Sequence, residues 1–385
     1  MTLLKNTFLK WSSYFPSTGI FLFLVTIASL VVSNSSFADY YIPFWKTPHF
    51  NFAGHEINFL FLINDFLMTL FFLNVGLEIK RELVVGELSS LKKSITPIVA
   101  AIGGMLLPAL IYFVLNFNSP FERGWGIPMA TDIAFAVAVL SLAGKNLPSG
   151  LKLFLMSLAI IDDLGAVIVI ALFYGQKLAF SFLLYAMVVF GLMLTMNFLK
   201  IKNTIYYLIL GLLAWYFVLC AGIHATIAGV VTAFFIPLKD TNGNESPLER
   251  LQNRLNIPVD YLILPLFAMA NTAIKLEFSS VGELFNMATI GVCLGLMIGK
   301  PLGILYATQI VVKLKIGQLP ENCDFKKIAG AGMLGGIGFT MSIFILTLAF
   351  PNNQIQTALK CAVLLSSLIM GIAGFAMLRV KDKIV

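Results

Sequence analysis

Long apolar runs recur along the whole chain, and only short polar connections separate them. Roughly twelve of these runs are long enough to cross a bilayer, at about 20 residues per helical span. Because lipid offers the backbone no hydrogen-bond partners, the segments that cross it must be helical. The sequence therefore predicts an all-α polytopic membrane protein whose residues 1–385 form a single transmembrane domain. We place the spans at residues 18–32, 57–77, 95–116, 126–143, 151–174, 180–199, 205–221, 224–237, 261–274, 285–312, 329–350 and 355–378.

The charge composition narrows the class further. The chain is 59% hydrophobic and 12% charged, whereas about a quarter of the residues of a soluble domain are charged. Its net charge of +7 does not indicate nucleic acid as a partner, because the basic residues are dispersed between apolar runs. Lysine and arginine favour alternate connections, and by the positive-inside rule this bias predicts that both termini are cytoplasmic. The expected partner is therefore a lipid bilayer.

The connection at residues 40–56 is extracytoplasmic in this scheme, and it interleaves aromatic residues with proline and glycine. That pattern is consistent with a β-hairpin. An aromatic belt at the membrane interface would use the same residues, so both interpretations stay open.

A few ionisable residues lie inside the predicted spans, where charges are rare. A charge at the bilayer centre costs about 2.5–3.5 kcal/mol and persists where it is paired or hydrated. These residues are therefore the candidates for function, and they are Asp65, Asp132, Asp162, Asp163 and Lys300.

Asp162 and Asp163 are adjacent on a predicted helix and have apolar residues on both sides. Neighbouring side chains of a helix project about 100° apart, so the two carboxylates can face one cavity. Two carboxylates in a medium of low dielectric do not both ionise easily, and a small hard cation prefers oxygen ligands. The pair predicts a site where protons and a cation compete. The alternative is a hydrogen-bonded pair that only ties helices together.

Two segments have the composition of interrupted helices. Pro128, Thr131 and Asp132 form the first, in which the carboxylate would neutralise the positive ends of half-helices; the alternative is a helix cap alone. The glycine-rich segment 332–340 is the second, although its glycines would also suit close helix packing. Lys300 precedes Pro301 deep in its own span. We expect Asp162 or Asp163 to be its partner, because an unpaired buried lysine is strongly destabilising. The alternative is a lysine that faces a hydrated funnel.

Six motifs, in order along the chain, resemble the NhaA family of sodium/proton antiporters: residues 71–83, 130–135, 161–166, 222–226, 262–268 and 335–342. The resemblance implies an inverted repeat with two interrupted helices that cross at mid-membrane, and paired interrupted helices are a mark of carrier sites, a rule drawn in part from this family. It implies that Asp162 and Asp163 bind Na⁺ or Li⁺ and carry protons. It implies that Lys300 pairs with Asp162, and that Asp132, beside Thr131, compensates charge at the crossing.

The same resemblance implies an activity and an assembly. The activity is electrogenic exchange of two protons inward for one sodium outward, which serves sodium and pH homeostasis in a bacterial inner membrane. No cofactor and no enzymatic step are implied, and the family dimerises through a hairpin that matches residues 40–56. The residues implied in the pH response are Glu78, Arg81, Glu82, His224 and Glu249. Strongly regulated members differ around Glu249, because they carry titrating side chains where Gln252, Asn253 and Asn256 stand here.

Other classes of function remain as alternatives. A cation-coupled transporter of another small solute would need more polar groups than the candidate site offers. An intramembrane aspartyl protease needs two aspartates that converge on one proton, and adjacent aspartates on one helix diverge. A channel would need a ring of filter carbonyls or like charges, and the sequence shows no sign of one.

Overall fold

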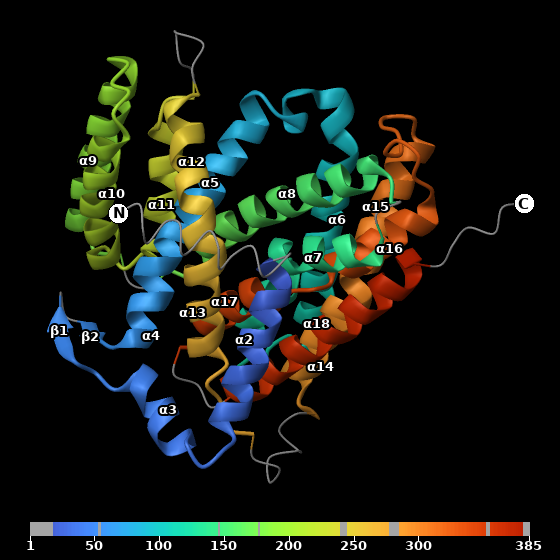
Figure 1. Ribbon diagram of the computed structural model, residues 1–385, viewed down its shortest axis with the longest axis horizontal. Coiled ribbons are helices and arrows are strands. Elements are labelled where there is room, and N and C mark those ends of the chain that lie inside the picture. Colours follow the sequence, from blue (N-terminus) through green and yellow to red (C-terminus); the bar gives the residue numbers. More distant parts are fainter. Residues whose placement is uncertain are drawn as a thin grey trace, which may run out of the picture. The chain divides into compact units, whose positions relative to one another are not determined.

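The computed structural model describes residues 18–52, 55–144, 147–175, 178–238, 245–276, 285–351 and 355–379. Helices dominate these residues, as predicted (Figure 1). The chain divides into two compact units, each assembled from segments far apart in the sequence. Unit 1 consists of Met1–Ala38, Ile95–Asp162 and Asn271–Val385, and unit 2 of Asp39–Ser94 and Asp163–Ala270.

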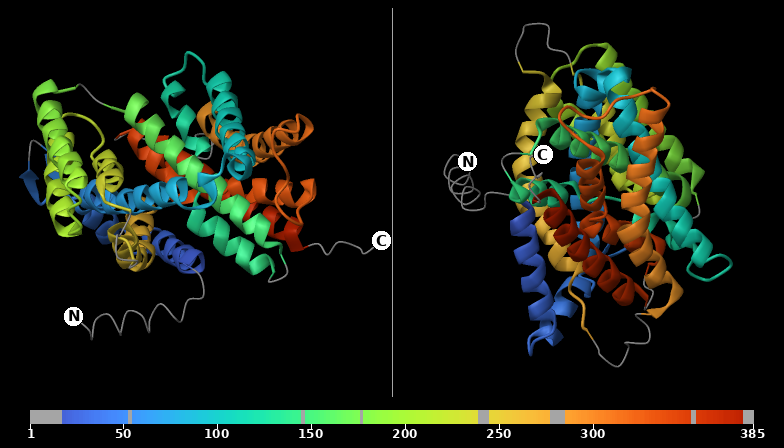
Figure 2. Two further views of the ribbon diagram at one scale, coloured as in Figure 1. Left: turned by 90° about the horizontal axis from the view of Figure 1, so that it is seen from above. Right: turned by 90° about the vertical axis from the view of Figure 1, so that its right-hand side faces the viewer.

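Unit 1 contains two long helices and a series of shorter helices that follow one another closely along the chain. Its elements are α2 (Thr18–Ser33), most of α6 (Leu91–Leu115), η3 (Glu122–Met129), α7 (Ile133–Ala143), the first part of α8 (Ser149–Phe173), α14 (Met287–Leu294), η6 (Gly295–Gly299), α15 (Lys300–Lys313), α16 (Phe325–Gly335), α17 (Phe339–Ala349) and α18 (Ile355–Arg379). Figure 2 shows α8 as one unbroken helix, and its 25 residues make it about 37 Å long.

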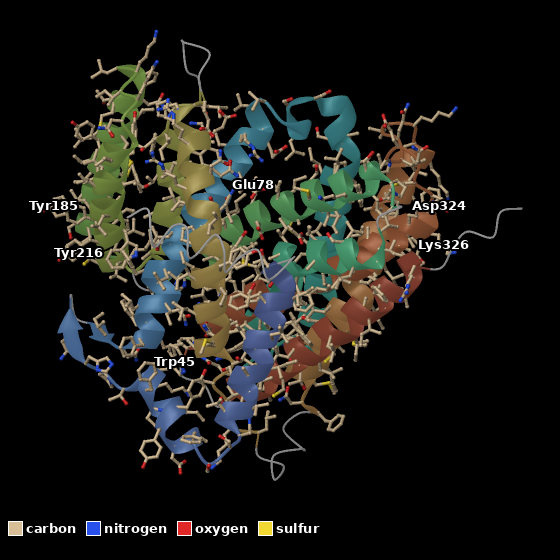
Figure 3. The ribbon with its side chains drawn as sticks, in the orientation of Figure 1. Trp45, Glu78, Tyr185, Tyr216, Asp324 and Lys326 are labelled. Carbon is tan, nitrogen blue, oxygen red and sulfur yellow. The ribbon has the colours of Figure 1, made fainter. Side chains whose placement is uncertain are left out.

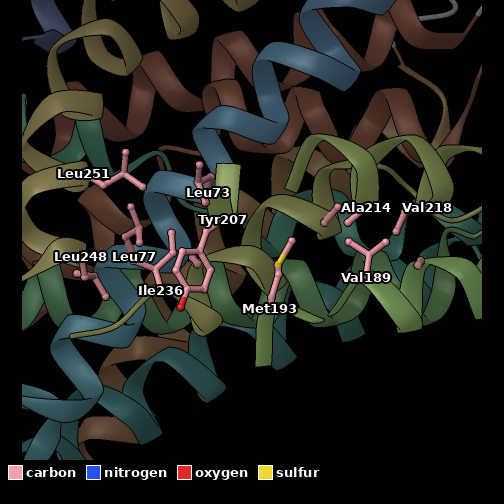
Figure 4. Packing of buried hydrophobic residues seen from close by; sticks show 13 residues of the cluster. Leu73, Leu77, Val189, Met193, Tyr207, Ala214, Val218, Ile236, Leu248 and Leu251 are labelled. Carbon is pink, nitrogen blue, oxygen red and sulfur yellow. The ribbon is translucent and has the colours of Figure 1, made fainter. Parts of the chain in front are cut away.

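Unit 2 is also helical, apart from one small hairpin. Its elements are α3 (Ala38–Lys46), β1 (Phe50–Phe52), β2 (His55–Ile57), α4 (Phe59–Phe61), η1 (Leu62–Leu67), α5 (Met68–Val84), η2 (Glu87–Ser89), the second part of α8, α9 (Phe180–Phe198), α10 (Thr204–Cys220), α11 (Thr226–Phe235), α12 (Pro247–Pro258), η4 (Val259–Ile263) and α13 (Leu264–Asn271). Its apolar core joins five of these helices, and Tyr207 lies fully buried within it, beside Leu77 and Ile236 (Figure 4).

Seven helical stretches in the described part of the chain are long and apolar enough to cross a membrane, and up to nine if each sharply bent pair of helices counts as one span. Two further apolar helices, α10 and α11, are shorter. The protein is therefore a multi-pass membrane protein.

The connection at residues 40–56 differs in part from the hairpin predicted there. β1 and β2 pair antiparallel, with Phe50 opposite Ile57, but the residues before them form helix α3. Helical spacing lets the ring of Tyr41 meet that of Trp45, four residues on, at a centroid distance of 5.8 Å. Trp45, which is labelled in Figure 3, is buried, so burial of aromatic rings on one helix face favours the helix here.

Both predicted helix interruptions are present in unit 1. Backbone that is not helical separates η3 from α7 at residues 130–132, and α16 from α17 at residues 336–338, where the axes bend by 45°. The first half of the earlier pair is a 3₁₀ helix, not the α-helix expected there. The two interruptions are bonded to each other, because the Asp132 N–H donates to the Ile337 carbonyl at 2.7 Å.

α6 and α15 approach so closely that glycine is required at their contact. A Cβ atom at Gly303 would lie 2.2 Å from the carbonyl oxygen of Gly103. Gly104 and Gly335 flank the stem of Lys300, since a Cβ on either would lie 3.9 Å from a carbon of that side chain. This packing places the first residue of α15 inside the unit.

Candidate functional site

A buried ion pair is the centre of the site in unit 1. The Lys300 ammonium donates hydrogen bonds to Oδ2 of Asp162 and to the backbone carbonyl of Met129. Lys300 is 0% exposed and Asp162 is 1% exposed. The other carboxylate oxygen, Oδ1 of Asp162, is buried and accepts no hydrogen bond from any described residue. A buried anionic oxygen with free lone pairs is what a cation would bind.

Thr131 lies in the first interruption and touches the same carboxylate. Its hydroxyl is 2.6 Å from Oδ2 of Asp162 and 2.8 Å from the carbonyl oxygen of Gly335, at the end of α16. A hydroxyl has one proton, so it donates to one of these oxygens at a time. The extended backbone at residues 130–132 lets the side chain reach both α8 and α16.

Asp132 caps two helices at once. Its Oδ1 accepts from the Phe135 N–H of α7 at 3.0 Å, and its Oδ2 accepts from the N–H and the hydroxyl of Thr340 in α17. The carboxylate therefore lies at the N-terminal ends of both half-helices, where a negative charge is stabilised by their dipoles.

Asp163 follows Asp162 on α8 and is 4% exposed. It is the first residue of the second part of α8, which is counted with unit 2. The helix passes unbroken through both residues, so their side chains project about 100° apart. Asp65, the remaining intramembrane acid, lies half-buried in the π-helical segment η1 of unit 2.

Oxygen atoms predominate around the ion pair. The Asp162 carboxylate, the Thr131 hydroxyl and the carbonyl of Gly335 are hard ligands, which suit a small hard cation better than a soft one. The positive charge of the Lys300 ammonium would repel a cation bound at the same carboxylate. The arrangement can therefore exchange a cation for protons at one buried carboxylate.

The predicted pH-response residues lie in unit 2, three of them on α5. Glu78 is on this helix (Figure 3), and Arg81 contacts Glu82 at 3.1 Å and Oε1 of Gln252 on α12 at 3.1 Å. His224 contacts the backbone carbonyl of Tyr174, at the end of α8, at 2.7 Å. Arg81 therefore belongs to the contact between α5 and α12, while His224 contacts the end of α8.

Glu249 closes the first turn of α12. Its carboxylate accepts from the backbone N–H of Ser246 at 2.9 Å and from the Ser246 hydroxyl, which in turn accepts from the Glu249 N–H. These hydrogen bonds hold the pKa of Glu249 below its usual value. The residue is therefore part of a helix cap, a role that the sequence analysis did not consider.

Asp260 is the functional candidate that the sequence analysis missed. It lies in η4, outside the predicted span 261–274, which is why a search for charges within spans passed over it. Burial, and then the negative charge of Glu78, raise its pKa to about 6. A signal was present in the sequence, because Gln252, Asn256 and Asp260 recur at four-residue spacing, which places polar groups on one helix face.

Comparisons with known proteins match the sequence over nearly the whole chain. Residues 10–378 match the family described as Na⁺/H⁺ antiporter 1. The chain is 49% identical to the Na⁺/H⁺ antiporter NhaA of Flavobacterium psychrophilum, over 94% of this chain and 93% of that protein. It is 49% identical to NhaA 1 of Flavobacterium johnsoniae, over 98% and 97% of the two chains. With NhaA of Helicobacter pylori it shares 45% identity, over 99% and 96%.

Proposed function

The chain belongs to the Na⁺/H⁺ antiporter 1 family and exchanges Na⁺ for H⁺, and we propose that Asp162 and Asp163 are the residues that bind the two ions in turn. The observation that supports this most is the environment of Asp162. Its carboxylate is buried, one oxygen is held by Lys300 and Thr131, and the other has no hydrogen bond from the described residues. Such a group binds a proton or a cation, and not both.

The stoichiometry that we propose is the one that the resemblance to the family implies, two protons for one Na⁺. In the proton-loaded carrier, Asp162 and Asp163 carry the protons and Lys300 compensates charge beside Asp162. When Na⁺ binds to these carboxylates it displaces the protons, because protons and a small hard cation compete for the same oxygens. Two protons are released for one Na⁺ bound. Two positive charges then move against one in each cycle, so the exchange is electrogenic. We expect Li⁺ to replace Na⁺ at the same oxygen ligands.

The site also supports a particular fold at membrane depth. We place the interrupted helices η3–α7 and α16–α17 across each other at mid-membrane, in halves related by inverted topology. Asp132 supports this arrangement, since it caps α7 and α17 together. Irregular backbone is tolerated at that depth only where protein or a water-filled cavity covers it. With the bent pairs and the shorter apolar helices α10, α11 and α13, the spans number about twelve.

Orientation and assembly follow from the connections. The distribution of lysine and arginine supports cytoplasmic termini in a bacterial inner membrane. The hairpin β1–β2, with α3 before it, is the surface that we assign to a homodimer contact. Glu78, Arg81, Glu82, His224 and Glu249 are the residues that we assign to the pH response.

The test is Na⁺-driven proton movement in proteoliposomes that contain only the purified protein. Asp163→Asn should abolish exchange but leave expression and folding unchanged. The reason is that an amide cannot release a proton and bind a cation in its place. Glu321→Gln, the same loss of charge at an exposed acid outside the site, should exchange like the parent. Substantial exchange by Asp163→Asn would refute the assignment. A requirement for a second solute would favour the cation-coupled transporter instead.

A further inference from the structure

The second interruption, where α16 ends and α17 begins, is held in place largely by hydrogen bonds to the first. The Gly335 carbonyl accepts from the Thr131 hydroxyl at 2.8 Å, and the Ile337 carbonyl accepts from the Asp132 N–H at 2.7 Å. Thr340 donates to the Asp132 carboxylate from both its N–H and its hydroxyl. The two interruptions therefore position each other.

One further hydrogen bond reaches this segment from a different helix. The Ser367 hydroxyl on α18 accepts from the N–H of Phe339, the first residue of α17, at 3.1 Å. An N–H at the start of a helix has no partner within that helix. Ser367 is 4% exposed and Phe339 is 3% exposed, so the serine, and not bulk water, satisfies this donor. Ser367 therefore caps α17 one residue before the N–H that Asp132 caps.

Ser367 lies on the face of α18 that runs along both halves of the interrupted helix. A Cβ at Gly371, one turn further on, would lie 3.8 Å from Cδ1 of Ile337, and a Cβ at Gly374 would lie 2.6 Å from Cδ2 of Leu334. Residues at this spacing share one face of a helix. The small residues let the helices approach closely, and this closeness brings the Ser367 hydroxyl within reach of the backbone of α17.

The capped end of α17 is connected to the cation site by a short stretch of backbone. Phe339 lies four residues after Gly335, whose carbonyl contacts the Thr131 hydroxyl, and that hydroxyl is 2.6 Å from Oδ2 of Asp162. The stretch is tightly packed, since a Cβ at Gly336 would lie 2.6 Å from a carbonyl oxygen of η6. Close-packed segments transmit displacement. A shift at Phe339 would therefore move the Gly335 carbonyl and the hydroxyl that bonds to it.

The neighbouring residue, Ser366, has the same side chain and no such role. It is 0% exposed, and its Oγ has no hydrogen bond with any described residue. The two serines are alike in residue type, in helix and in burial. They differ in the bond to α17, so Ser366 is a matched control for Ser367.

We propose that Ser367 is a positioning residue for Na⁺ binding: its hydroxyl holds the start of α17, and with it the Gly335 carbonyl and the Thr131 hydroxyl, at the cation site. The inference rests on the proposed function, because it takes Asp162 as a ligand of the ion. Asp132 supplies negative charge to two half-helices, whereas Ser367 supplies a neutral acceptor for one N–H. Loss of the serine hydroxyl therefore changes the geometry of the site and leaves its charge unchanged.

The test is the sodium dependence of exchange by the full-length protein in proteoliposomes. Ser367→Ala removes the acceptor, and the KM for Na⁺ should rise by about 2- to 10-fold, the equivalent of one hydrogen bond. Ser366→Ala removes a hydroxyl that bonds no described residue and should keep the KM of the parent. An unchanged KM in Ser367→Ala would overturn the proposal, because a cap that only stabilises the fold lowers the amount of active protein and the maximal rate. An equal rise in both variants would overturn it too.

A milder variant keeps the test open if Ser367→Ala does not fold. Ser367→Cys is similar in size and offers sulfur, a weak acceptor, so its KM should lie above that of the parent and below that of Ser367→Ala. A KM equal to that of the parent would refute the need for the oxygen.

Hydrogen exchange tests the cap without transport. The backbone N–H of Phe339 should exchange faster with solvent in Ser367→Cys than in the parent, and at the parent's rate in Ser366→Ala. Equal protection in all three proteins would show that the serine does not hold α17. These results are separate from the proposed function, which is refuted by exchange in Asp163→Asn. If Asp163→Asn is inactive and both Ser367 variants keep the parent's KM, only the role of Ser367 fails.

Discussion

Lys300 carries a charge that the surrounding protein tolerates only because Asp162 neutralises it. Lys300→Ala leaves a buried carboxylate without its partner, and breaking such a pair costs about 3–5 kcal/mol. We therefore expect a clear fall in the thermal unfolding temperature in detergent, together with a shifted pH profile of exchange. Lys313→Ala removes a lysine from the exposed end of the same helix and should change neither. Equal unfolding temperatures for the two variants would mean that Lys300 faces water.

Most of the site residues could be predicted because charge inside an apolar run has few explanations. Asp132, Asp162, Asp163 and Lys300 stand out in this way, and the structure places three of them in contact with helix ends or with one another. Asp260 could not be found by that criterion, since it lies just before a span. Its importance depends on Glu78, which is far away in the sequence, and the sequence alone does not show which helices pack together.

At the scale of elements, the contact between α6 and α15 positions Lys300. Gly303→Ala would place a Cβ atom 2.2 Å from the Gly103 carbonyl, so the two helices must separate, at a cost of about 1–3 kcal/mol. We expect lower thermal stability and weaker exchange. Gly191→Ala in α9 is the matched control, because no described atom lies within 4 Å of its Cβ, and alanine stabilises a helix by about 1 kcal/mol relative to glycine. Equal losses in both variants would contradict this account.

The cap of α12 should be sensitive to acid. The folded-state pKa of Glu249 is lowered from 4.5 by its hydrogen bonds to Ser246. Its contribution is therefore present above pH 4.5 and is lost as the pH falls through the lowered pKa. Glu249→Gln should be less stable than the parent at neutral pH, by no more than about 1 kcal/mol, as for other helix caps. The two should converge in acid. The measurement is hydrogen exchange of α12 in both proteins across pH. If the difference in stability between Glu249→Gln and the parent persists or grows in acid, the cap is not its cause.

The interruptions of the helices could be predicted, because Pro128, Thr131 and Asp132 are poor helix-interior residues and a glycine run marks the second break. The hairpin was only partly predicted. Alternating aromatics suggested strands, but Tyr41 and Trp45 are also spaced for a helix, and packing of their rings decides in favour of α3. The π-helical segments had no sequence signal, since packing selects the bonding pattern of a backbone turn.

At the scale of the whole molecule, the division into two units could not be predicted from the sequence. Each unit joins segments that are far apart in the sequence, and α8 contributes to both, with the boundary between Asp162 and Asp163. Hydropathy identifies spans one at a time and contains no information about which of them pack together. The membrane class, by contrast, follows from composition alone, because a chain with 12% charged residues cannot cover a soluble surface.

At the scale of transport by the whole molecule, the effect of acidic pH should be reversed by sodium. Protons compete with Na⁺ at Asp162 and Asp163, so raising sodium should restore exchange at acidic pH. We therefore expect the rate of exchange to rise at a higher pH when sodium is limiting than when sodium is saturating. The measurement is the initial rate of exchange across pH at both concentrations. Two superimposable profiles would refute competition, because saturating sodium would then have displaced no protons from the aspartates.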